Sequence, residues 1–233
     1  MDRPRRIVLV RHAESQRNKA KLKSVYFADD AARDRLEGTP DHDINLTIEG
    51  RRQAKLTGIG LCEEFGIFDY AYHSGYRRTQ ETVNGILKAY TSKERESMQI
   101  RRDTELRERD PGYAYDMTTE EAEKNFPWLQ KHWDTFGPIM ARPPGGESLA
   151  DVVRRTRAFY ETILRTRRKG DNVLIVCHGG VIRSFRWLFE LAQHKGSYEW
   201  VDEISPKNCS VTSYEYDTKK SKLLCSYYNK VYY

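Results

Sequence analysis

The chain has 233 residues, of which 38% are hydrophobic and 32% are charged, and its formal net charge is +6. This composition is typical of a globular protein with a heavily charged surface and excludes a disordered chain. The length suffices for one sizeable α/β domain, and we expect residues 1–233 to form a single domain.

The distribution of charged residues and cysteines bears on whether the protein binds nucleic acid, spans a membrane or contains disulfides. Basic residues are interspersed with acidic ones and no aromatic–basic RNA-binding pattern occurs, so the net charge predicts one cationic pocket rather than nucleic-acid binding. No segment resembles a signal peptide or has the length of a membrane span, and the four cysteines form no CxxC pair. We therefore expect a reduced, cytoplasmic setting without a nucleic-acid or membrane partner.

The first predicted element is a strand. The apolar run Ile7–Val10 is short, β-branched and flanked by charge, which is typical of a strand buried on both faces of a parallel sheet. It ends at Arg11 and His12. The polar segment 14–40 that follows predicts a loop or a short helix, and excursions of this length are usually functional or mobile.

Helices and strands alternate over the next part of the chain. Thr47 is a candidate N-cap for a helix that ends near Gly66. A strand over Phe68–His73, a helix over Tyr76–Tyr90 and a further strand over Met98–Arg101 follow. The residues expected on the inner faces of the two helices are Ala54, Ile59, Cys62, Phe65, Val83, Ile86, Leu87 and Tyr90.

The middle of the chain is rich in proline and glycine. Residues 104–146 therefore predict a loop-rich cap with one short helix near Glu120–Asn125. Ser148 and Asp151 then resemble a capping box that begins a long amphipathic helix. The inward positions of that helix are Leu149, Val152, Val153, Thr156, Phe159, Tyr160, Ile163 and Leu164.

The last third of the chain completes the predicted fold. A strand over Val173–Val176 leads to His178, a helix over Val181–Gln193 follows, and a hairpin pairs Ser210–Tyr216 with Leu223–Tyr228. This order predicts the α/β class: a three-layer α/β/α sandwich whose central sheet is mostly parallel, with an antiparallel C-terminal edge and a loop-rich cap.

Two histidines follow two predicted strands and suggest one shared site. His12 ends the first strand, and His178 ends the strand 173–176 just before Gly179 and Gly180. Ligands of parallel sheets bind beyond the carboxyl ends of the strands, and a helix N-terminus there favours an anion. A histidine after a strand is more often structural than catalytic when taken alone. The matching contexts nevertheless predict a phosphate pocket.

The residue types near these strand ends fit phosphoryl transfer. A neutral His12 is a nucleophile that needs no metal, and the Arg11 guanidinium matches two phosphate oxygens at once. Arg77 or Arg78, at the start of the next helix, can reach the same pocket, although such a pair is more often surface charge. Glu108 is the expected general acid, with Glu105 as its rival and a surface salt-bridge cluster as the alternative.

Five segments spell a family pattern, and in chain order they are VRHAESQRN at 10–18, SGYRRTQET at 74–82, LRERDPG at 106–112, PPGGESLADVVRR at 143–155 and VCHGGVIR at 176–183. The chain resembles the histidine phosphatase superfamily, the phosphoglycerate-mutase-like proteins. The resemblance implies that His12 is the phosphorylated nucleophile and Glu108 the proton donor. It places Arg11, Arg78 and His178 around the phosphate.

The same resemblance assigns supporting roles. It implies that Asn18 donates to the phosphate and that Gly179, with its neighbouring glycine, allows the backbone to approach it closely. Glu147 and Ser148 match a pair that supports the site, while a helix-capping role for them is an equal alternative. Neither a metal nor another cofactor is expected, and the partner is a small phosphorylated substrate.

The departures from the family pattern separate the possible activities. Arg17 and Pro111 replace a tryptophan and a tyrosine of phosphoglycerate mutases, and Ala13 stands where glycine is usual. These changes favour metal-independent phosphomonoester hydrolysis by a histidine phosphatase. Phosphoglycerate mutase-type transfer and a catalytically idle phosphate-binding scaffold stay open as alternatives, and the sequence does not specify the physiological substrate or the oligomeric state.

Overall fold

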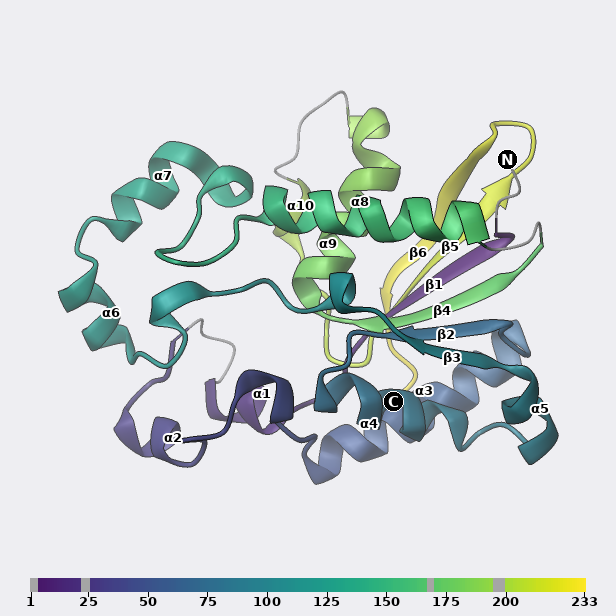
Figure 1. The fold of residues 1–233 in the computed structure, drawn as a ribbon, viewed down its shortest axis with the longest axis horizontal. Helices are drawn as coiled ribbons and strands as arrows, with labels where there is room; N and C mark the ends of the chain where they lie inside the picture. The colour runs from purple at the N-terminus through teal and green to yellow at the C-terminus, as the bar shows by residue number, and fades with distance from the viewer. Residues whose placement is uncertain (1–3, 22–25, 167–169, 195–199) are drawn as a thin grey trace.

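This computed structural model describes residues 4–21, 26–166, 170–194 and 200–233. They contain one six-stranded sheet, whose strands lie in the order β3-β2-β4-β1-β5-β6 (Figure 1). The strands are β1 (Arg6–Arg11), β2 (Tyr70–His73), β3 (Gln99–Arg102), β4 (Asn172–Cys177), β5 (Val211–Asp217) and β6 (Lys222–Lys230). β1, β2, β3 and β4 run parallel, and β5 and β6 add the antiparallel edge, as predicted.

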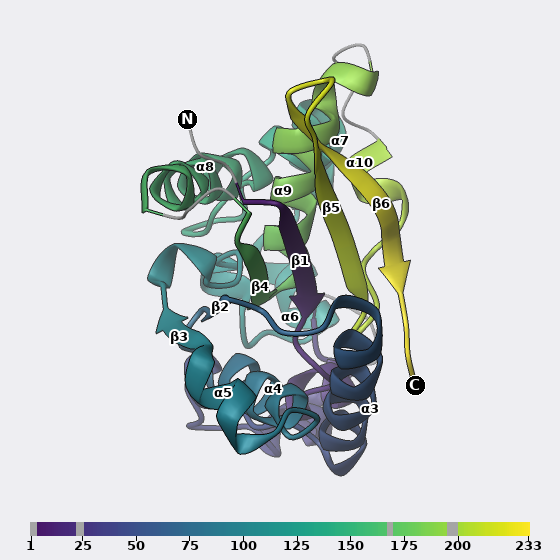
Figure 2. The ribbon, with the colours of Figure 1, turned by 90° about the vertical axis from the view of Figure 1, so that its right-hand side faces the viewer.

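Helices cover both faces of the sheet. α3 (Ile48–Phe65), α4 (Arg77–Leu87) and α5 (Ser92–Ser97) lie on one side, and α8 (Leu149–Thr166) and α9 (Gly179–Glu190) lie on the other (Figures 1 and 2). The predicted three-layer α/β/α sandwich is therefore confirmed. Short α10 (Trp200–Glu203) lies beside α9.

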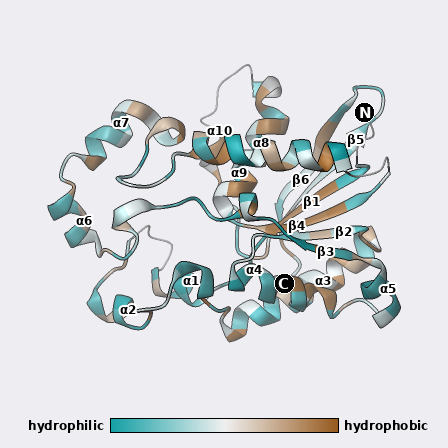
Figure 3. Ribbon diagram, viewed as in Figure 1, coloured by the Kyte–Doolittle hydropathy of each residue, from teal (hydrophilic) through white to brown (hydrophobic). Residues whose placement is uncertain are grey.

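The central strand β1 explains why its sequence is apolar at every position. Ile7 and Leu9 pack into the core under α8 and α9, whereas Val8 and Val10 pack into the core under α3 and α4. All four side chains are fully buried. Because successive residues of a strand face opposite sides, a strand between two helical layers must be apolar throughout. In Figure 3 the central strands β1 and β4 are coloured as hydrophobic, whereas the edge strand β3 is hydrophilic.

The cap differs from the prediction. It contains α6 (Thr119–Asn125), which was expected, and also α7 (Leu129–Met140), which was not. Gly137 interrupts α7: its φ of 69° is not helical, so α7 consists of two helical pieces that meet at a kink there. Only Leu129 and Ile139 of α7 are buried.

Smaller differences concern the first half of the chain. The segment 14–40 holds two short helices, α1 (Gln16–Lys21) and α2 (Asp30–Asp34), while residues 22–25 lie outside the described residues. α5 was not predicted, although Thr91 and Glu94 form its capping box. Ile59 was wrongly placed inward: it is 41% exposed, because the closely packed face of α3 is built mainly from small and polar residues.

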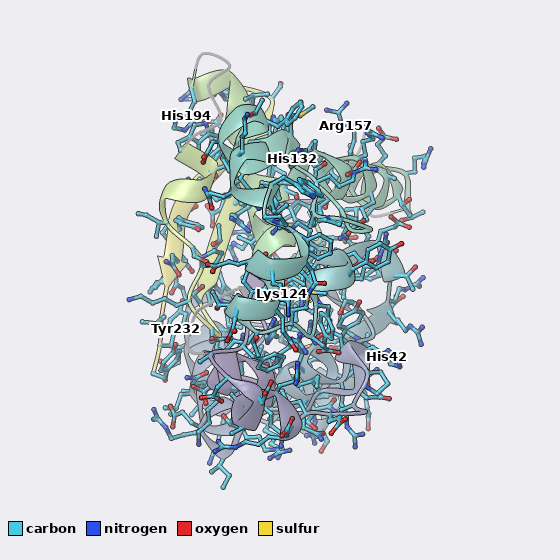
Figure 4. The ribbon with its side chains drawn as sticks, turned by 90° about the vertical axis from the view of Figure 1, so that its left-hand side faces the viewer. His42, Lys124, His132, Arg157, His194 and Tyr232 are labelled. Carbon is cyan, nitrogen blue, oxygen red and sulfur yellow. The ribbon has the colours of Figure 1, made fainter. Side chains whose placement is uncertain are left out.

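The cap and the first excursion lie together at the carboxyl ends of β1 and β4 (Figure 1). A parallel bridge pairs Phe27 with Thr118 and joins the two segments. Figure 4 views the molecule from this end, with Lys124 of α6 and His132 of α7 facing the viewer. None of the helices within the described residues is long and apolar enough to span a membrane.

Candidate active site

Neighbouring strands bring the two predicted histidines together. β1 and β4 pair in register, with Arg11 opposite Cys177, so the next residue of each strand is a histidine at the same edge of the sheet. The His12 and His178 ring centroids are 5.1 Å apart with an interplanar angle of 62°. Their exposed fractions are 3% and 0%. Parallel pairing thus turns a separation of more than 160 residues in the sequence into ring contact.

A cavity of about 940 Å³ opens beside the histidines. Of the residues predicted for the site, those that line it are Arg11, His12, Asn18, Arg78, Glu108 and Gly179. His178 is not part of this lining and packs against His12. The rival candidates Arg77 and Glu105 are absent from the lining, as are Glu147 and Ser148.

The His12 imidazole is held in one tautomer. Its Nδ1 lies 2.8 Å from the Ala13 carbonyl oxygen. A carbonyl can only accept a hydrogen bond, so Nδ1 carries the proton and Nε2 keeps its lone pair. Burial, together with the charges of Arg78 and Arg11, holds the pKa of His12 well below its usual value. The lowered pKa favours the neutral ring, in which Nε2 carries the free lone pair.

A chain of hydrogen bonds orients His178. Its Nε2 lies 2.9 Å from Ser74 Oγ, Ser74 Oγ lies 2.9 Å from Thr79 Oγ1, and Thr79 Oγ1 donates to the Tyr76 carbonyl at 2.7 Å. All three bonds form only if Ser74 donates to Thr79 and His178 Nε2 donates to Ser74. Nδ1 is then unprotonated.

The unprotonated Nδ1 of His178 faces the second carboxylate oxygen of Glu108. The two atoms, Nδ1 and Oε2, are 3.8 Å apart, and Nδ1 has no hydrogen-bond partner within the described residues. The pKa of His178 is held low by burial and then by the charge of Arg78. A bound anion would oppose this shift and favour a proton at Nδ1.

Two of the predicted arginines reach the cavity from different elements. Arg11 donates from Nη1 to the Pro206 carbonyl at 2.6 Å. Arg78 lies in the first turn of α4, is 4% exposed, and forms a bidentate ion pair with Asp41. Its neighbour Arg77 points to solvent, where Nε lies 3.8 Å from Glu81 Oε1. Of the two arginines left open by the residues alone, the structure brings Arg78 into the pocket.

Glu108 is the carboxylate that reaches the histidines. Its Oε1 accepts a hydrogen bond from the Arg109 backbone N–H at 2.8 Å, which leaves Oε2 to face His178. Glu105 is half-exposed and lies 3.9 Å from Arg107, as in the surface-cluster alternative.

Glu147 and Arg155 hold the Glu108 loop in place. Arg155 forms two 3.0 Å hydrogen bonds to Glu147, and it donates to the backbone carbonyls of Glu105 at 2.6 Å and Glu108 at 3.2 Å. Glu147 also accepts from the Asp110 backbone N–H at 3.0 Å. Ser148 instead caps α8, where Asp151 N–H donates to its Oγ and Asp151 Oδ2 accepts in return. The two neighbours thus have different tasks.

Asn18 and the glycines complete the predicted set. Asn18 Oδ1 accepts from Ser15 and from Asn208 Nδ2, so its own amide N–H group is the part that can donate to an anion. A Cβ at Gly179 would meet only the Arg11 side chain at 3.8 Å, whereas one at Gly180 would lie 3.0 Å from Glu108 Oε1. Close approach is therefore required at Gly180, and its partner is Glu108.

The sequence reasoning missed several residues around the cavity. Arg109, Arg183, Lys21 and Asp41 line it. Burial, and then the charge of Arg17, lowers the pKa of Lys21 to about 7. No local pattern marks Asp41, because its partner Arg78 is 37 residues away. Arg155 could have been found from the sequence, because it is a charged residue among the apolar positions of the buried face of α8.

A family model described as histidine phosphatase superfamily (branch 1) matches residues 7–228. The chain belongs to the histidine phosphatase superfamily. Histidine phosphatases and their mutase relatives are enzymes, and phosphohistidine-type catalysis fits the geometry of the pocket.

Curated relatives of this histidine phosphatase homologue include mutases. A 2,3-bisphosphoglycerate-dependent phosphoglycerate mutase of Afipia carboxidovorans is 31% identical, over 80% of this chain and 81% of the relative. The phosphoglycerate mutase-like protein AT74H of Arabidopsis thaliana is 32% identical, over 78% of this chain and 64% of the relative.

Solved structures share the histidine phosphatase fold. Bacillus stearothermophilus YhfR superposes with a TM-score of 0.72 at 24% identity, covering 97% of each chain. A mycobacterial glucosyl-3-phosphoglycerate phosphatase in complex with inorganic phosphate superposes with a TM-score of 0.69 at 22% identity, covering 97% of this chain and 98% of the other.

Proposed function

We propose that this protein hydrolyses small phosphomonoesters through a phosphohistidine on His12, with Glu108 as general acid and base. The observation that carries the proposal is the hydrogen bond from His12 Nδ1 to Ala13, because it leaves a neutral Nε2 as nucleophile beside two arginines. The proposal takes residues 1–233 as one domain in a cytoplasmic setting.

In the first step, His12 Nε2 attacks phosphorus, a P–N bond forms, and the bond from phosphorus to the leaving oxygen breaks. Glu108 gives its proton to that oxygen. Because Oε1 already accepts the Arg109 N–H, Oε2 is the oxygen that carries this proton. A phosphate dianion in the pocket raises the pKa of a nearby carboxyl and so favours the protonated form.

In the second step, water attacks phosphorus and Glu108 takes its proton. The P–N bond breaks, its electron pair returns to Nε2, and inorganic phosphate leaves. Arg11, Arg78 and His178 stabilise the charge on the phosphoryl oxygens, and removing one such donor typically slows a reaction by about a hundredfold to a thousandfold. Within the described residues no group of three His, Cys, Asp or Glu side chains could hold a metal ion, and the proposed steps use none.

Phosphoglycerate mutase activity is the second candidate, and the names of the curated relatives favour it. Arg17 supports hydrolysis instead. It is 8% exposed, stacks 3.3 Å from the Tyr115 ring centroid, and donates to Asp116. A buried arginine bonded to Asp116 thus occupies the position at which the family pattern of mutases carries tryptophan.

The test is turnover of an aryl phosphate with chelator present, comparing the wild type with His12→Ala, beside a phosphoglycerate mutase assay primed with 2,3-bisphosphoglycerate. We expect chelator-resistant hydrolysis that His12→Ala abolishes. Activity only in the primed assay would assign a mutase. Silence in both assays, with binding of inorganic phosphate retained, would assign an idle scaffold.

A further inference from the structure

Asp41 holds the end of the Arg78 side chain. Arg78 Nη1 donates to the Asp41 backbone carbonyl at 2.6 Å and to Asp41 Oδ1 at 3.0 Å, and Nη2 donates to Oδ2 at 3.1 Å. A guanidinium has five N–H groups in a planar fork. Asp41 therefore takes three of the five, including both on Nη1.

The two remaining N–H groups form one edge of the guanidinium. They are Nε–H and the second Nη2–H, and they point in the same direction with the spacing that two phosphate oxygens require. Arg78 lines the cavity although its side chain is only 5% exposed. Asp41 thus uses the end of the fork and leaves an intact bidentate edge for an anion.

Packing fixes both partners of this ion pair. Asp41 begins a 3₁₀ turn, Asp41–Asp43, that packs against α4, and the Arg78 guanidinium carbon lies 4.8 Å from the centroid of the Tyr76 ring. Burial would raise the pKa of Asp41, but the charge and hydrogen bonds of Arg78, with smaller contributions from Tyr115 and Arg17, outweigh it and the pKa lies below its usual value. The carboxylate is charged, and the guanidinium is held at its end and on its face.

We propose that Asp41 is a positioning residue for phosphoryl transfer, which fixes Arg78 so that its Nε–Nη2 edge faces the phosphoryl oxygens. This inference rests on the proposed function. The opposite role, in which Asp41 stands in for the phosphate and must be displaced, predicts an effect of opposite sign: removing Asp41 would then strengthen anion binding.

The experiment compares Asp41→Ala, the near-isosteric Asp41→Asn and the control Asp43→Asn. Asp43 lies on the same 3₁₀ turn, but its side chain is 53% exposed and it faces His42 at 3.5 Å (His42 is labelled in Figure 4). For each variant we would measure kcat and KM with an aryl phosphate, and the inhibition constants of vanadate and inorganic phosphate. Vanadate imitates the five-coordinate transition state, whereas phosphate imitates the ground state.

For Asp41→Ala we expect kcat to fall by about tenfold to hundredfold, because a misplaced catalytic group costs factors of this size. Vanadate should bind at least about tenfold more weakly and phosphate only slightly more weakly, since the arginine edge matters most in the transition state. Asp41→Asn should show a smaller loss of the same kind, and Asp43→Asn should match the wild type.

A double-mutant cycle that combines Asp41→Ala with Arg78→Ala tests whether Asp41 acts through Arg78. We expect Asp41→Ala to add less than about twofold to the loss in an Arg78→Ala background. Unchanged or tighter vanadate binding in Asp41→Ala, or full additivity in the cycle, would overturn the inference. If the alanine variant does not fold, the same comparison is made with Asp41→Asn. Wild type that neither turns over the ester nor binds vanadate would overturn the proposed function instead.

Discussion

Replacing Arg155 with methionine should both destabilise the protein and slow it. The Arg155 side chain is 7% exposed, and the change removes its two bonds to Glu147 and the donors of two backbone carbonyls in the Glu108 loop. Breaking a buried ion pair by removing one partner costs about 3–5 kcal/mol. We expect the free energy of unfolding to fall by about 3 kcal/mol, the lower end of this range. The loss is limited because Glu147 retains its ion pair with Arg107 and its hydrogen bond from the Asp110 N–H.

The kinetic loss follows from the same contacts. Arg155 ties the carbonyls of Glu105 and Glu108 to α8, so its removal frees the loop that carries the proposed acid. We expect kcat to fall by about tenfold or more. Urea unfolding gives the stability and aryl phosphate turnover gives kcat. Arg154→Met is the matched control, since that side chain is 80% exposed and 3.8 Å from Asp151, and it should change stability by less than about 0.5 kcal/mol.

The pH dependence of stability and a double variant test whether the loss in Arg155→Met comes from its ion pair with Glu147. Burial alone would raise the pKa of Glu147. Its hydrogen bonds to Arg155 and Asp110 lower the pKa by more than burial raises it, so the net shift is downward. Such a group stabilises the fold above its unfolded pKa, about 4.3, and this contribution is lost as the pH falls through the folded pKa. The deficit of Arg155→Met should therefore shrink below about pH 4. Glu147→Gln combined with Arg155→Met should cost less than the sum of the single changes. A deficit below about 1 kcal/mol with unchanged kcat would refute the reasoning.

Three further predictions concern single residues. Arg78→Ala should lower kcat by about a hundredfold to a thousandfold, because it removes a donor to the phosphoryl oxygens. Replacing its exposed neighbour, in Arg77→Ala, should change kcat by less than about twofold. Equal losses in the two variants would contradict the placement of Arg78 in the pocket. Because the pKa of His12 is depressed, the imidazole stays neutral as the pH falls through about 6.5, and the acid limb of kcat/KM should lie below that value in a pH–rate profile. Gly58→Ala should lower the free energy of unfolding by more than about 1 kcal/mol in urea titrations, since the new Cβ would lie 2.4 Å from the Ile86 carbonyl oxygen.

Local patterns in the sequence determined most of the framework. Apolar runs defined β1 and β4, a capping box placed the start of α8, and both predicted histidines lie at the ends of those strands. These features depend on neighbours within a few residues, so one sequence suffices to read them. The residues and the family pattern together indicated Arg78, Glu108 and the two histidines. The structure brings His12, Arg78 and Glu108 to one cavity and places His178 beside His12 and Glu108.

Tertiary structure alone decided which polar groups meet. The pairing of Asp41 with Arg78 and of Arg155 with the Glu108 loop joins residues 37 and 47 positions apart, and no local periodicity encodes such contacts. The sequence by itself determined the strand ends and the reactive side chains, because these follow from near neighbours. Chain packing determined the tautomers of the two histidines and the position of the Arg78 guanidinium, because these depend on groups that only folding brings into contact.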